Sequence, residues 1–558
     1  MRARAALFPV SLLLAACAAG TTTTAAAPEP AAPQPAPAAT QPAPPPTAAG
    51  VDPATAPTDS ANAPLASAPD AWQLLDLDED RVPGVSAARA YRELLADRSP
   101  ARTVVVAVID GGVDTAHVDL RETLWRNADE TPGNGVDDDD NGYVDDIYGW
   151  NFIGGADGRN VGHETLEVTR LHARCLDGGT LPAALTCEEI AQDFAAKRTE
   201  AEQTLTQIQQ IEAALDHAMP LLREAVGGEE PTVESVRALT PTRRDVLQAQ
   251  QIFLQLDAAG IGQEDLVEGK EAYEGLLQYG YDPAFETRDV VGDDFSDGSQ
   301  TGYGNPDVMG PDASHGTHVT GIIGAARGNG IGMDGVASSV QIMTVRTVPD
   351  GDERDKDVAN AIRYAVDNGA QIINMSFGKA YSPRKALVDA AVRYADERGV
   401  LMVHAAGNDG EDLEIEASFP TRDYEDGGQA ANWIEVGAAD WKVAGLAAPF
   451  SNYGSTSVDV FAPGVDILST VPGSEFDRED GTSMAAPVVT GVAALLMAYF
   501  PDLTAADVKS ILLESSVKHG DRSVPRPGTG EPVPFGTLSV TGGVVNAYEA
   551  VRITLERM

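Results

Sequence analysis

The amino-acid sequence predicts an α/β fold in which a doubly wound parallel sheet is flanked by helices. Residues 103–109, Thr-Val-Val-Val-Ala-Val-Ile, form an uninterrupted run rich in β-branched side chains, which is typical of a strand buried on both faces. Four similar runs follow, at residues 340–345, 371–375, 400–405 and 434–438. They alternate with helix-like segments such as 358–368 and 383–398, and this alternation indicates a parallel sheet covered by helices.

The composition agrees with a large folded region and narrows the class of protein. The chain has 558 residues, of which 43% are hydrophobic and 22% are charged, so it can bury a sizeable core. Its 39 Lys and Arg against 85 Asp and Glu give a net charge of −46, which repels phosphates and excludes a nucleic-acid partner. Three cysteines are too few for a disulfide scaffold or a four-cysteine zinc site.

Residues 1–16 have the features of an export signal. Arg2 and Arg4 precede an apolar run that is too short to span a membrane. Residues 14–17, Leu-Ala-Ala-Cys, resemble a bacterial lipobox, in which the cysteine, here Cys17, receives a diacylglycerol and becomes the mature N-terminus. We therefore expect an exported protein of the bacterial cell envelope that is lipid-anchored to a membrane. A plain signal peptide is the alternative interpretation.

The remaining segments divide the chain by composition. Residues 17–70 contain mostly Thr, Ala and Pro after the cysteine, and this composition predicts a disordered tether because it cannot bury enough apolar surface to fold. Residues 71–102 form a short N-terminal extension, residues 103–551 the main domain and residues 552–558 a C-terminal tail. The apolar stretch 488–500 is too short for a membrane span and predicts a buried helix.

Three segments carry the candidate chemistry. They are Val-Ile-Asp-Gly-Gly at 108–112, Ser-His-Gly-Thr-His-Val-Thr-Gly at 314–321 and Gly-Thr-Ser-Met-Ala-Ala-Pro at 481–487. Together they resemble the subtilisin-like serine peptidases, whose catalytic triad runs Asp, His, Ser along the chain. The resemblance implies a subtilisin-like fold and a serine endopeptidase that requires no cofactor for its chemistry.

Two further segments extend the resemblance, which covers about residues 103–152 and 306–551. Asn-Met-Ser-Phe-Gly at 374–378 is similar to the family's substrate-binding strand, and Ala-Ala-Gly-Asn at 405–408 is similar to its oxyanion block. The resemblance therefore implies that Ser376, Phe377 and Gly378 bind substrate and that Asn408 binds the oxyanion.

The residue types suit the roles that the resemblance implies. Ser483 is the expected nucleophile, and a serine hydroxyl needs a base such as His315 within hydrogen-bond reach. Asp110, at the end of the first strand, would orient the imidazole and stabilise its protonated form. The backbone N–H of Ser483, at the start of an apolar helix, and the side-chain amide of Asn408 would bind the oxyanion.

Each of these residues also has a structural explanation when it is taken alone. Asp110 could end a strand in a turn, Ser483 could cap a helix and His315 could lie in a loop. Their joint order along the chain favours the catalytic interpretation. A metal shared by His315 and His318 is a minor alternative, because no cluster of Cys or His elsewhere in the sequence supplies further ligands.

An acidic loop at residues 134–146 is a candidate site for structural calcium. Its Asp-x-Asp-x-Asn-Gly spacing puts oxygen ligands at alternate positions and a glycine at the turn. The candidate ligands are Asp137, Asp139, Asn141, Tyr143 and Asp145. The twelfth position holds Tyr148 instead of the usual Glu, so a solvated acidic loop remains the alternative.

A large insertion separates Asp110 from His315. The 204 residues between them replace the few tens expected in close relatives of subtilisin. About residues 162–281 are mainly α-helical by pattern, with apolar residues at spacings of three and four, namely Leu205, Ile208, Ile211, Leu215, Met219 and Leu222. A second amphipathic segment near residues 233–256 completes a helical hairpin, which we expect beside the active-site cleft, where it could also bind a protein partner.

Cys175 and Cys187 lie 12 residues apart at the start of this insertion. In an exported protein they predict a disulfide, and two buried free thiols are the alternative.

The sequence thus predicts a lipid-anchored serine endopeptidase that hydrolyses protein or peptide substrates through an acyl-enzyme on Ser483. The alternative is a catalytically idle subtilisin-like scaffold that binds a partner through its helical insertion. The intact triad and Asn408 favour the enzyme.

Overall fold

The computed structural model describes residue 65 and residues 67–558. The predicted signal peptide 1–16, Cys17 and almost all of the predicted tether 17–70 therefore lie outside the described residues. From Pro69 to the C-terminus the chain belongs to one unit by its internal contacts.

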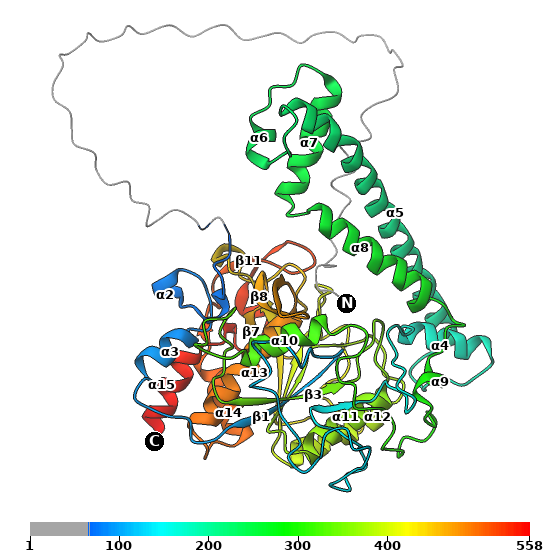
Figure 1. The fold of residues 1–558 in the computed structure, drawn as a ribbon, viewed down its shortest axis with the longest axis vertical. Helices are drawn as coiled ribbons and strands as arrows, with labels where there is room; N and C mark the ends of the chain where they lie inside the picture. The colour runs from blue at the N-terminus through cyan, green and yellow to red at the C-terminus, as the bar shows by residue number, and fades with distance from the viewer. Residues whose placement is uncertain (1–64, 66) are drawn as a thin grey trace, which may run out of the picture. The chain divides into compact units, whose positions relative to one another are not determined.

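A nine-stranded sheet forms the centre of the fold, in the order β10-β13-β7-β6-β5-β4-β1-β3-β2 (Figure 1). Neighbouring strands run parallel except the edge pair β10 and β13. The strands are β1 Val104–Asp110, β2 Gly149–Asn151, β3 Val340–Arg346, β4 Ile372–Met375, β5 Leu401–Ala405, β6 Trp433–Ala439, β7 Val460–Pro463, β10 Val517–Lys518 and β13 Gly543–Val544. Because β1 lies between β3 and β4, the sheet grows in both directions from β1, and the predicted doubly wound parallel sheet is confirmed.

Helices cover both faces of this sheet. Ala107 and Ile109 of β1 share a core with α11 (Asp355–Asp367) and α12 (Lys385–Glu397). Side chains alternate along a strand, so Val106 and Val108, both fully buried, face the other side. There α10 (Ser314–Gly324) and α13 (Thr482–Tyr499) contact β1 and each other. The uninterrupted apolar pattern of β1 thus results from burial on both faces.

Helix α13 passes through the centre of the molecule. Among the described residues it is the one helix that is long and apolar enough to cross a membrane, and 94% of that apolar window is buried inside the fold. Such burial identifies α13 as a core helix, as the apolar stretch 488–500 predicts.

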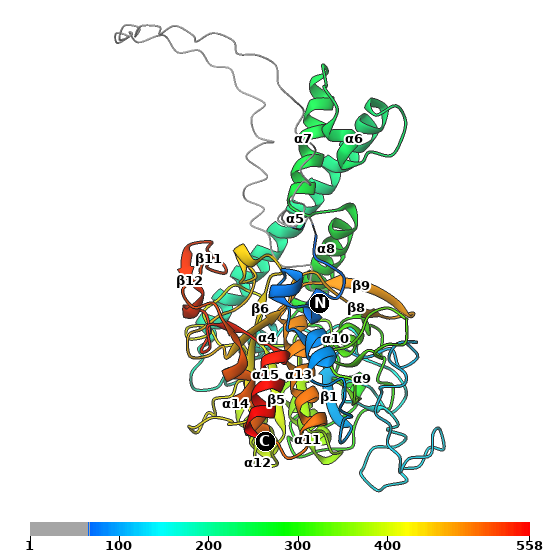
Figure 2. The ribbon, with the colours of Figure 1, turned by 90° about the vertical axis from the view of Figure 1, so that its left-hand side faces the viewer.

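The N-terminal extension wraps around the main domain. It contains η4 (Trp72–Leu74), α2 (Leu77–Asp80) and α3 (Ala87–Glu93). The indole of Trp72 is fully buried and donates a hydrogen bond to the carbonyl of Val465 at 2.9 Å. Helix α3 packs against the C-terminal helix α15 (Ala547–Arg557) (Figure 1 and Figure 2).

The predicted C-terminal tail 552–558 is wrong in its boundary. Helix α15 runs Ala547–Arg557 and includes almost all of that segment. Thr554 is buried, and the guanidinium of Arg557 binds the carboxylate of Glu514 on α14 (Ala505–Ser515) at 2.5 Å. The segment is helical because its inner face continues the packing of α15.

The insertion is mainly helical, as predicted. Its elements are α4 Glu167–Leu176, α5 Cys187–Ala225, α6 Val233–Arg237, α7 Arg244–Ala258, α8 Gln263–Gly275 and the π-helical turn η5 Leu276–Gly280. Helix α5 packs against α7 and α8 to form a hairpin above α4 (Figure 1). The amphipathic segment 233–256 is divided between α6 and α7.

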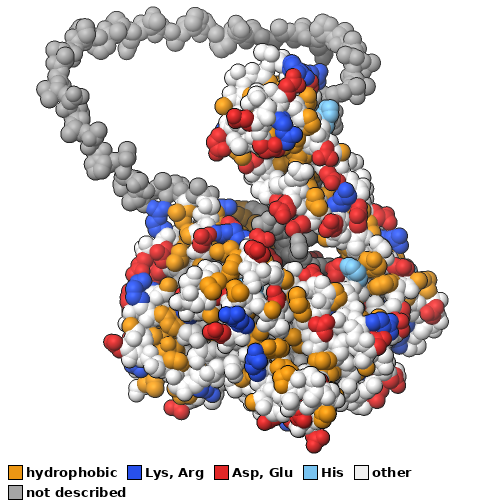
Figure 3. Space-filling model, viewed as in Figure 1, with side chains coloured by type: hydrophobic (Ala, Val, Ile, Leu, Met, Phe, Trp, Pro, Cys, Tyr) orange, Lys and Arg blue, Asp and Glu red, His pale blue; other side chains and the backbone are white. Residues whose placement is uncertain are grey.

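The remaining elements are short. They are α9 Arg288–Val291, η6 Val443–Gly445, η7 Phe535–Thr537 and two hairpins, β8 Ile467–Val471 with β9 Glu475–Glu479 and β11 Ser523–Pro525 with β12 Pro532–Pro534. On the face that Figure 3 shows, acidic and basic side chains are interspersed over the helical hairpin of the insertion and over the main domain. The described part of that face offers no continuous basic surface of the kind that binds nucleic acid.

Candidate active site

Asp110 and His315 meet at the carboxyl end of the central strand. Asp110 is the last residue of β1 and is 2% exposed, while His315 lies in the first turn of α10. The Nδ1 atom of His315 lies 2.8 Å from Oδ1 of Asp110. Desolvation of the imidazole alone would lower its pKa, but the charge and hydrogen bond of Asp110 outweigh it and raise the pKa of His315.

Ser483 is presented by the start of the core helix. It is the second residue of α13 and is 8% exposed, and its hydroxyl donates a hydrogen bond to the carbonyl of Ser376 at 3.1 Å. Its backbone N–H is one of the first in the helix, so it has no partner within the helix and carries the positive end of the helix dipole.

Asn408 lies in the loop after β5, next to the start of α13. Its Oδ1 accepts hydrogen bonds from the backbone N–H and the hydroxyl of Thr482, at 2.9 Å each. Because the carbonyl half of the amide is used in this way, its NH2 half is left as the donor. The arrangement suits a donor aimed at an oxyanion.

Residues 376–378 continue strand β4 beside the nucleophile. The hydroxyl of Ser376 donates to the carbonyl of Ser483 at 2.9 Å, which ties this segment to α13. At Gly378 a Cβ would lie 2.5 Å from Oγ of Ser418, so a larger residue would displace that neighbour. Phe377 is 9% exposed and belongs to the core shared with α11 and α12.

Glu479 is a titratable group near the triad that sequence reasoning missed. It ends β9 four residues before Ser483 and is 8% exposed. Burial raises its pKa to about 7, although the charge of His315 opposes that rise. Its position in the sequence gives no signal, because the burial comes from elements that are distant along the chain.

His318 lies in the core and is fully buried. Its Nε2 lies 3.2 Å from the carbonyl of Asp477, and burial lowers its pKa to about 3. The ring is therefore neutral and donates to that carbonyl.

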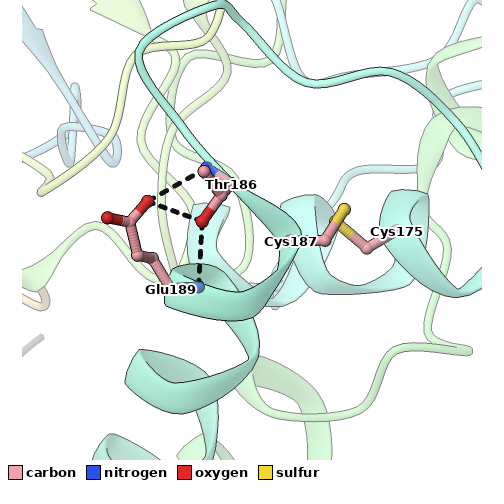
Figure 4. Close-up of a disulfide and its surroundings, with 4 residues drawn as sticks. All are labelled: Cys175, Thr186, Cys187 and Glu189. Atoms are coloured by element: carbon pink, nitrogen blue, oxygen red, sulfur yellow. Dashed lines mark hydrogen bonds between the residues drawn. A yellow bond between two sulfur atoms is a disulfide. The ribbon is translucent and has the colours of Figure 1, made fainter.

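The structure joins Cys175 and Cys187 in a disulfide, the pairing that the sequence favours (Figure 4). Cys187 is the first residue of α5, and Thr186 and Glu189 form a capping box around it. The bridge therefore fixes the start of the long helix α5 to the end of α4.

The acidic loop brings together only part of the predicted calcium ligands. Carboxylate oxygens of Asp137 and Asp139 lie within 4.8 Å of each other and of Glu130, a residue that sequence reasoning missed. Asp145 is not among the carboxylates that converge there, and its oxygens accept hydrogen bonds from the backbone amides of Asn134 and Gly135.

The two other predicted ligands have different surroundings. The ring of Tyr143 packs in the core against Trp150 and Tyr364. Asn141 donates its side-chain amide to Asp139 at 3.1 Å, so it lies at the edge of the acidic group. The loop's geometry fits a cation held by Glu130, Asp137 and Asp139.

The sequence profile of the subtilase family matches residues 101–530. The thermophilic serine proteinase of Bacillus sp. (strain AK1) is 39% identical over 237 residues, 42% of this chain and 54% of the relative. Subtilisin BL of Lederbergia lenta is 37% identical over 239 residues, 43% of this chain and 77% of the relative. The match thus spans about half the length of the first relative and three quarters of the second.

Among solved structures, a protease of Pseudoalteromonas arctica PAMC 21717 aligns with a TM-score of 0.44 and 20% identity, covering 85% of this chain and 95% of that chain. The family profile alone covers more than half of the sequence. The chain therefore belongs to the subtilase family of serine-type endopeptidases.

Proposed function

We propose that this protein is an exported, lipid-anchored serine endopeptidase that cleaves protein or peptide substrates with Ser483 as its nucleophile. The observation that supports this most is the hydrogen bond of 2.8 Å between His315 and Asp110 at the carboxyl end of β1. The helix that begins at Thr482 presents Ser483 to the same edge of the sheet.

Each side chain has one task in the proposed reaction. His315 accepts the proton of the Ser483 hydroxyl as Oγ attacks the carbonyl carbon of the scissile bond. The backbone N–H of Ser483 and the amide of Asn408 stabilise the oxyanion that forms. The protonated imidazole, stabilised by Asp110, then gives its proton to the leaving amine, and water hydrolyses the acyl-enzyme by the same route.

The hydroxyl of Ser483 makes a different hydrogen bond before substrate binds. It donates to the carbonyl of Ser376, so it turns towards His315 when the reaction starts. Catalytic hydrogen bonds are commonly loose before substrate binds, and a turn about one side-chain bond costs little.

Labelling with a fluorophosphonate probe tests the proposal. The probe should modify the wild-type protein, and Ser483→Ala should remove both labelling and peptide hydrolysis, with a loss of kcat on the order of a millionfold. The matched control is Ser515→Ala, which changes a buried serine of α14 and should keep full labelling. A folded wild-type protein that resists the probe would instead support the idle scaffold.

The lipid anchor is proposed from the sequence of residues 14–17 and is tested separately. A diacylglycerol on Cys17 supplies two acyl chains, the number that stable anchoring usually takes. Cells fed a palmitate analogue should label the wild-type protein but not Cys17→Ser. Labelling that persists in Cys17→Ser would overturn the anchor without affecting the proposed chemistry.

We further propose that a structural calcium ion binds Glu130, Asp137 and Asp139. The support is the convergence of three carboxylates within 4.8 Å, since hard oxygen ligands are those that calcium prefers. The ion would hold the acidic loop and has no part in the chemistry of the triad.

A further inference from the structure

We propose that the root of the helical insertion positions the substrate-binding strand, with Lys379 as the positioning residue that connects them. The root consists of α4 and the first turns of α5, and the strand is the segment 376–378. The proposal rests on the proposed function, because it concerns how that active site holds an extended peptide.

Lys379 follows Gly378 directly and buries its ammonium group. Its side chain is 2% exposed. Its Nζ lies 3.1 Å from Oε2 of Glu167, 2.8 Å from Oδ1 of Asp355 and 2.7 Å from the carbonyl of Glu353. One buried cation therefore holds two segments of the chain, residue 167 and residues 353–355, against the end of the strand.

The partners of this cation belong to different elements. Glu167 is the first residue of α4, in the insertion, and Asp355 is the first residue of α11, in the main domain. Desolvation would raise the pKa of Glu167, but the charges of Arg170 and Lys379 lower it to about 2, so the carboxylate stays ionised. Removing one member of a buried ionic group leaves the remaining charges uncompensated and costs stability. The native protein therefore keeps these charged groups at fixed positions relative to one another.

A second contact joins the residues that follow the strand segment to helix α5. The hydroxyl of Tyr381, two residues after Lys379, donates a hydrogen bond to Oδ2 of Asp193 at 2.8 Å. The disulfide between Cys175 and Cys187 fixes the beginning of α5, so Asp193 is presented from a restrained helix. The insertion root therefore contacts residues 379–381 through two independent groups.

The charge of helix α5 also influences Asp409, which follows Asn408. Desolvation raises the pKa of Asp409, and the charge of Lys197 on α5 opposes that rise. The direct contacts of the root are those to residues 379–381.

The position of the strand matters for long substrates more than for small ones. The carbonyl of Ser376, the first residue of this segment, lies 3.1 Å from Oγ of Ser483, so the segment begins at the reacting atoms. An extended peptide binds such a strand through its backbone, residue by residue. A small shift of residues 376–378 therefore weakens binding of peptides that extend along the strand, while a compact ester needs only the triad and the oxyanion donors.

The test compares two substrates in three variants of the full chain. Lys379→Met removes the cation but keeps the length of the side chain, Lys379→Arg keeps the charge, and Lys385→Met breaks a comparable ion pair with Asp389 that lies within α12. The substrates are a small acyl amino-acid ester and a peptide anilide that extends several residues on the acyl side.

We expect Lys379→Met to raise KM for the extended anilide about tenfold, with kcat and ester hydrolysis nearly unchanged. The reason is that the lost contact stabilises bound substrate and transition state equally. Lys379→Arg should restore most of the wild-type KM, and Lys385→Met should leave both substrates unaffected. Equal losses on both substrates, or an unchanged KM in folded Lys379→Met, would overturn the proposal.

A second variant keeps the proposal testable if Lys379→Met does not fold. Tyr381→Phe removes only the hydroxyl that binds Asp193, and it should raise KM for the anilide about threefold and spare the ester. No selective change in folded Tyr381→Phe would then reject the proposal. Fluorophosphonate labelling of the wild type reports separately on the proposed function, since a positioning failure leaves labelling intact.

Discussion

The amide of Asn408 is held in one orientation by the first residue of α13. Its Oδ1 accepts two hydrogen bonds from Thr482 at 2.9 Å, which directs the NH2 group to the side where the oxyanion forms. Asn408→Leu should therefore lower kcat about a hundred- to a thousandfold and leave KM almost unchanged, because one donor to the transition state is lost. The measurement is kcat and KM on a peptide anilide.

Thr482→Val is the matched control for this prediction. It removes one of the two hydrogen bonds that orient Asn408 and keeps the amide itself, so its loss of kcat should be smaller than that of Asn408→Leu. A wild-type kcat in Asn408→Leu would show that Asn408 has no part in oxyanion binding.

The pH dependence of kcat/KM should report the raised pKa of His315. The reaction needs the neutral imidazole, so kcat/KM is low below this pKa and rises to a plateau above it. Asp110 raises the pKa by its charge and hydrogen bond, against the effect of desolvation. In Asp110→Asn the acidic limb should move to lower pH and the plateau should fall about ten-thousandfold.

A second group near the triad requires a control for this profile. Burial raises the pKa of Glu479 to about 7, close to the range of the histidine. If the acidic limb of the kcat/KM profile persists in Glu479→Gln and moves in Asp110→Asn, it reports the titration of His315. An acidic limb that is unchanged in Asp110→Asn and absent in Glu479→Gln would assign the titration to Glu479 instead.

Residue motifs are informative about position where a residue lies at the end of a regular element. Asp110 ends a strand and His315 and Ser483 begin helices, so their local sequence also determines where they point. Lys379 and Glu130 could not be predicted in this way. The partner Glu167 of Lys379 lies 212 residues away in the sequence, and a single charged residue such as Glu130 carries no periodic signal.

At the level of elements, buried strands were the most predictable part of the fold. The run 103–109 becomes β1 Val104–Asp110, and the run 434–438 lies within β6 Trp433–Ala439. The polar strand β9 was not predicted, because four of its five residues are charged and its pairing with β8 decides its conformation. The segment 233–256 was read as one helical unit, but Pro241 and its neighbours divide it between α6 and α7.

The acidic loop is an element whose stability should depend on calcium. A calcium ion that binds the folded loop and not the unfolded chain should raise the melting temperature, and a chelator should lower it. At a calcium concentration a hundred times the dissociation constant, mass action stabilises the fold by about 2.7 kcal/mol. Thermal unfolding with and without chelator measures the effect.

A double variant locates the ion that such a shift would report. Asp137→Asn with Asp139→Asn removes two of the three carboxylates and should abolish the calcium-dependent shift. This double variant is needed because another carboxylate could be the ligand. Oδ2 of Asp119 is buried and has no hydrogen-bond partner among the described residues. A shift that survives the double variant would show that calcium binds outside the acidic loop.

On the scale of the whole molecule, the insertion is less separate from the catalytic domain than its sequence suggests. Its helical pattern predicts an independent hairpin, yet Glu167 and Arg170 at its root take part in the buried ionic group around Lys379. Deleting all of residues 162–281 would leave that cation without its insertion partner, so we expect a folded deletion variant to bind the extended anilide more weakly, as Lys379→Met does, and to keep ester hydrolysis.

A shorter deletion should separate the root from the rest of the hairpin. Two apolar clusters lie in the outer part and include Leu215, Leu222, Val236, Leu256 and Leu266, while a third at the root includes Val168, Leu171, Ile190, Phe194 and Tyr281. The side chains of Thr204 on α5 and Tyr273 on α8 interact with each other at the boundary between the two outer clusters and the root cluster. A short Gly/Ser linker from Thr204 to Tyr273 therefore removes two complete clusters and leaves the third intact.

This truncation should keep the wild-type rates on the small ester and the extended anilide, because every contact that holds residues 376–381 remains. Any effect of the outer hairpin should then appear only on large folded substrates, whose approach to Ser483 it can restrict. The measurement is the ratio of hydrolysis rates on a folded protein and on the anilide, with folding checked by circular dichroism. A folded truncation that loses ester hydrolysis would show that the outer hairpin, and not the root, organises the active site.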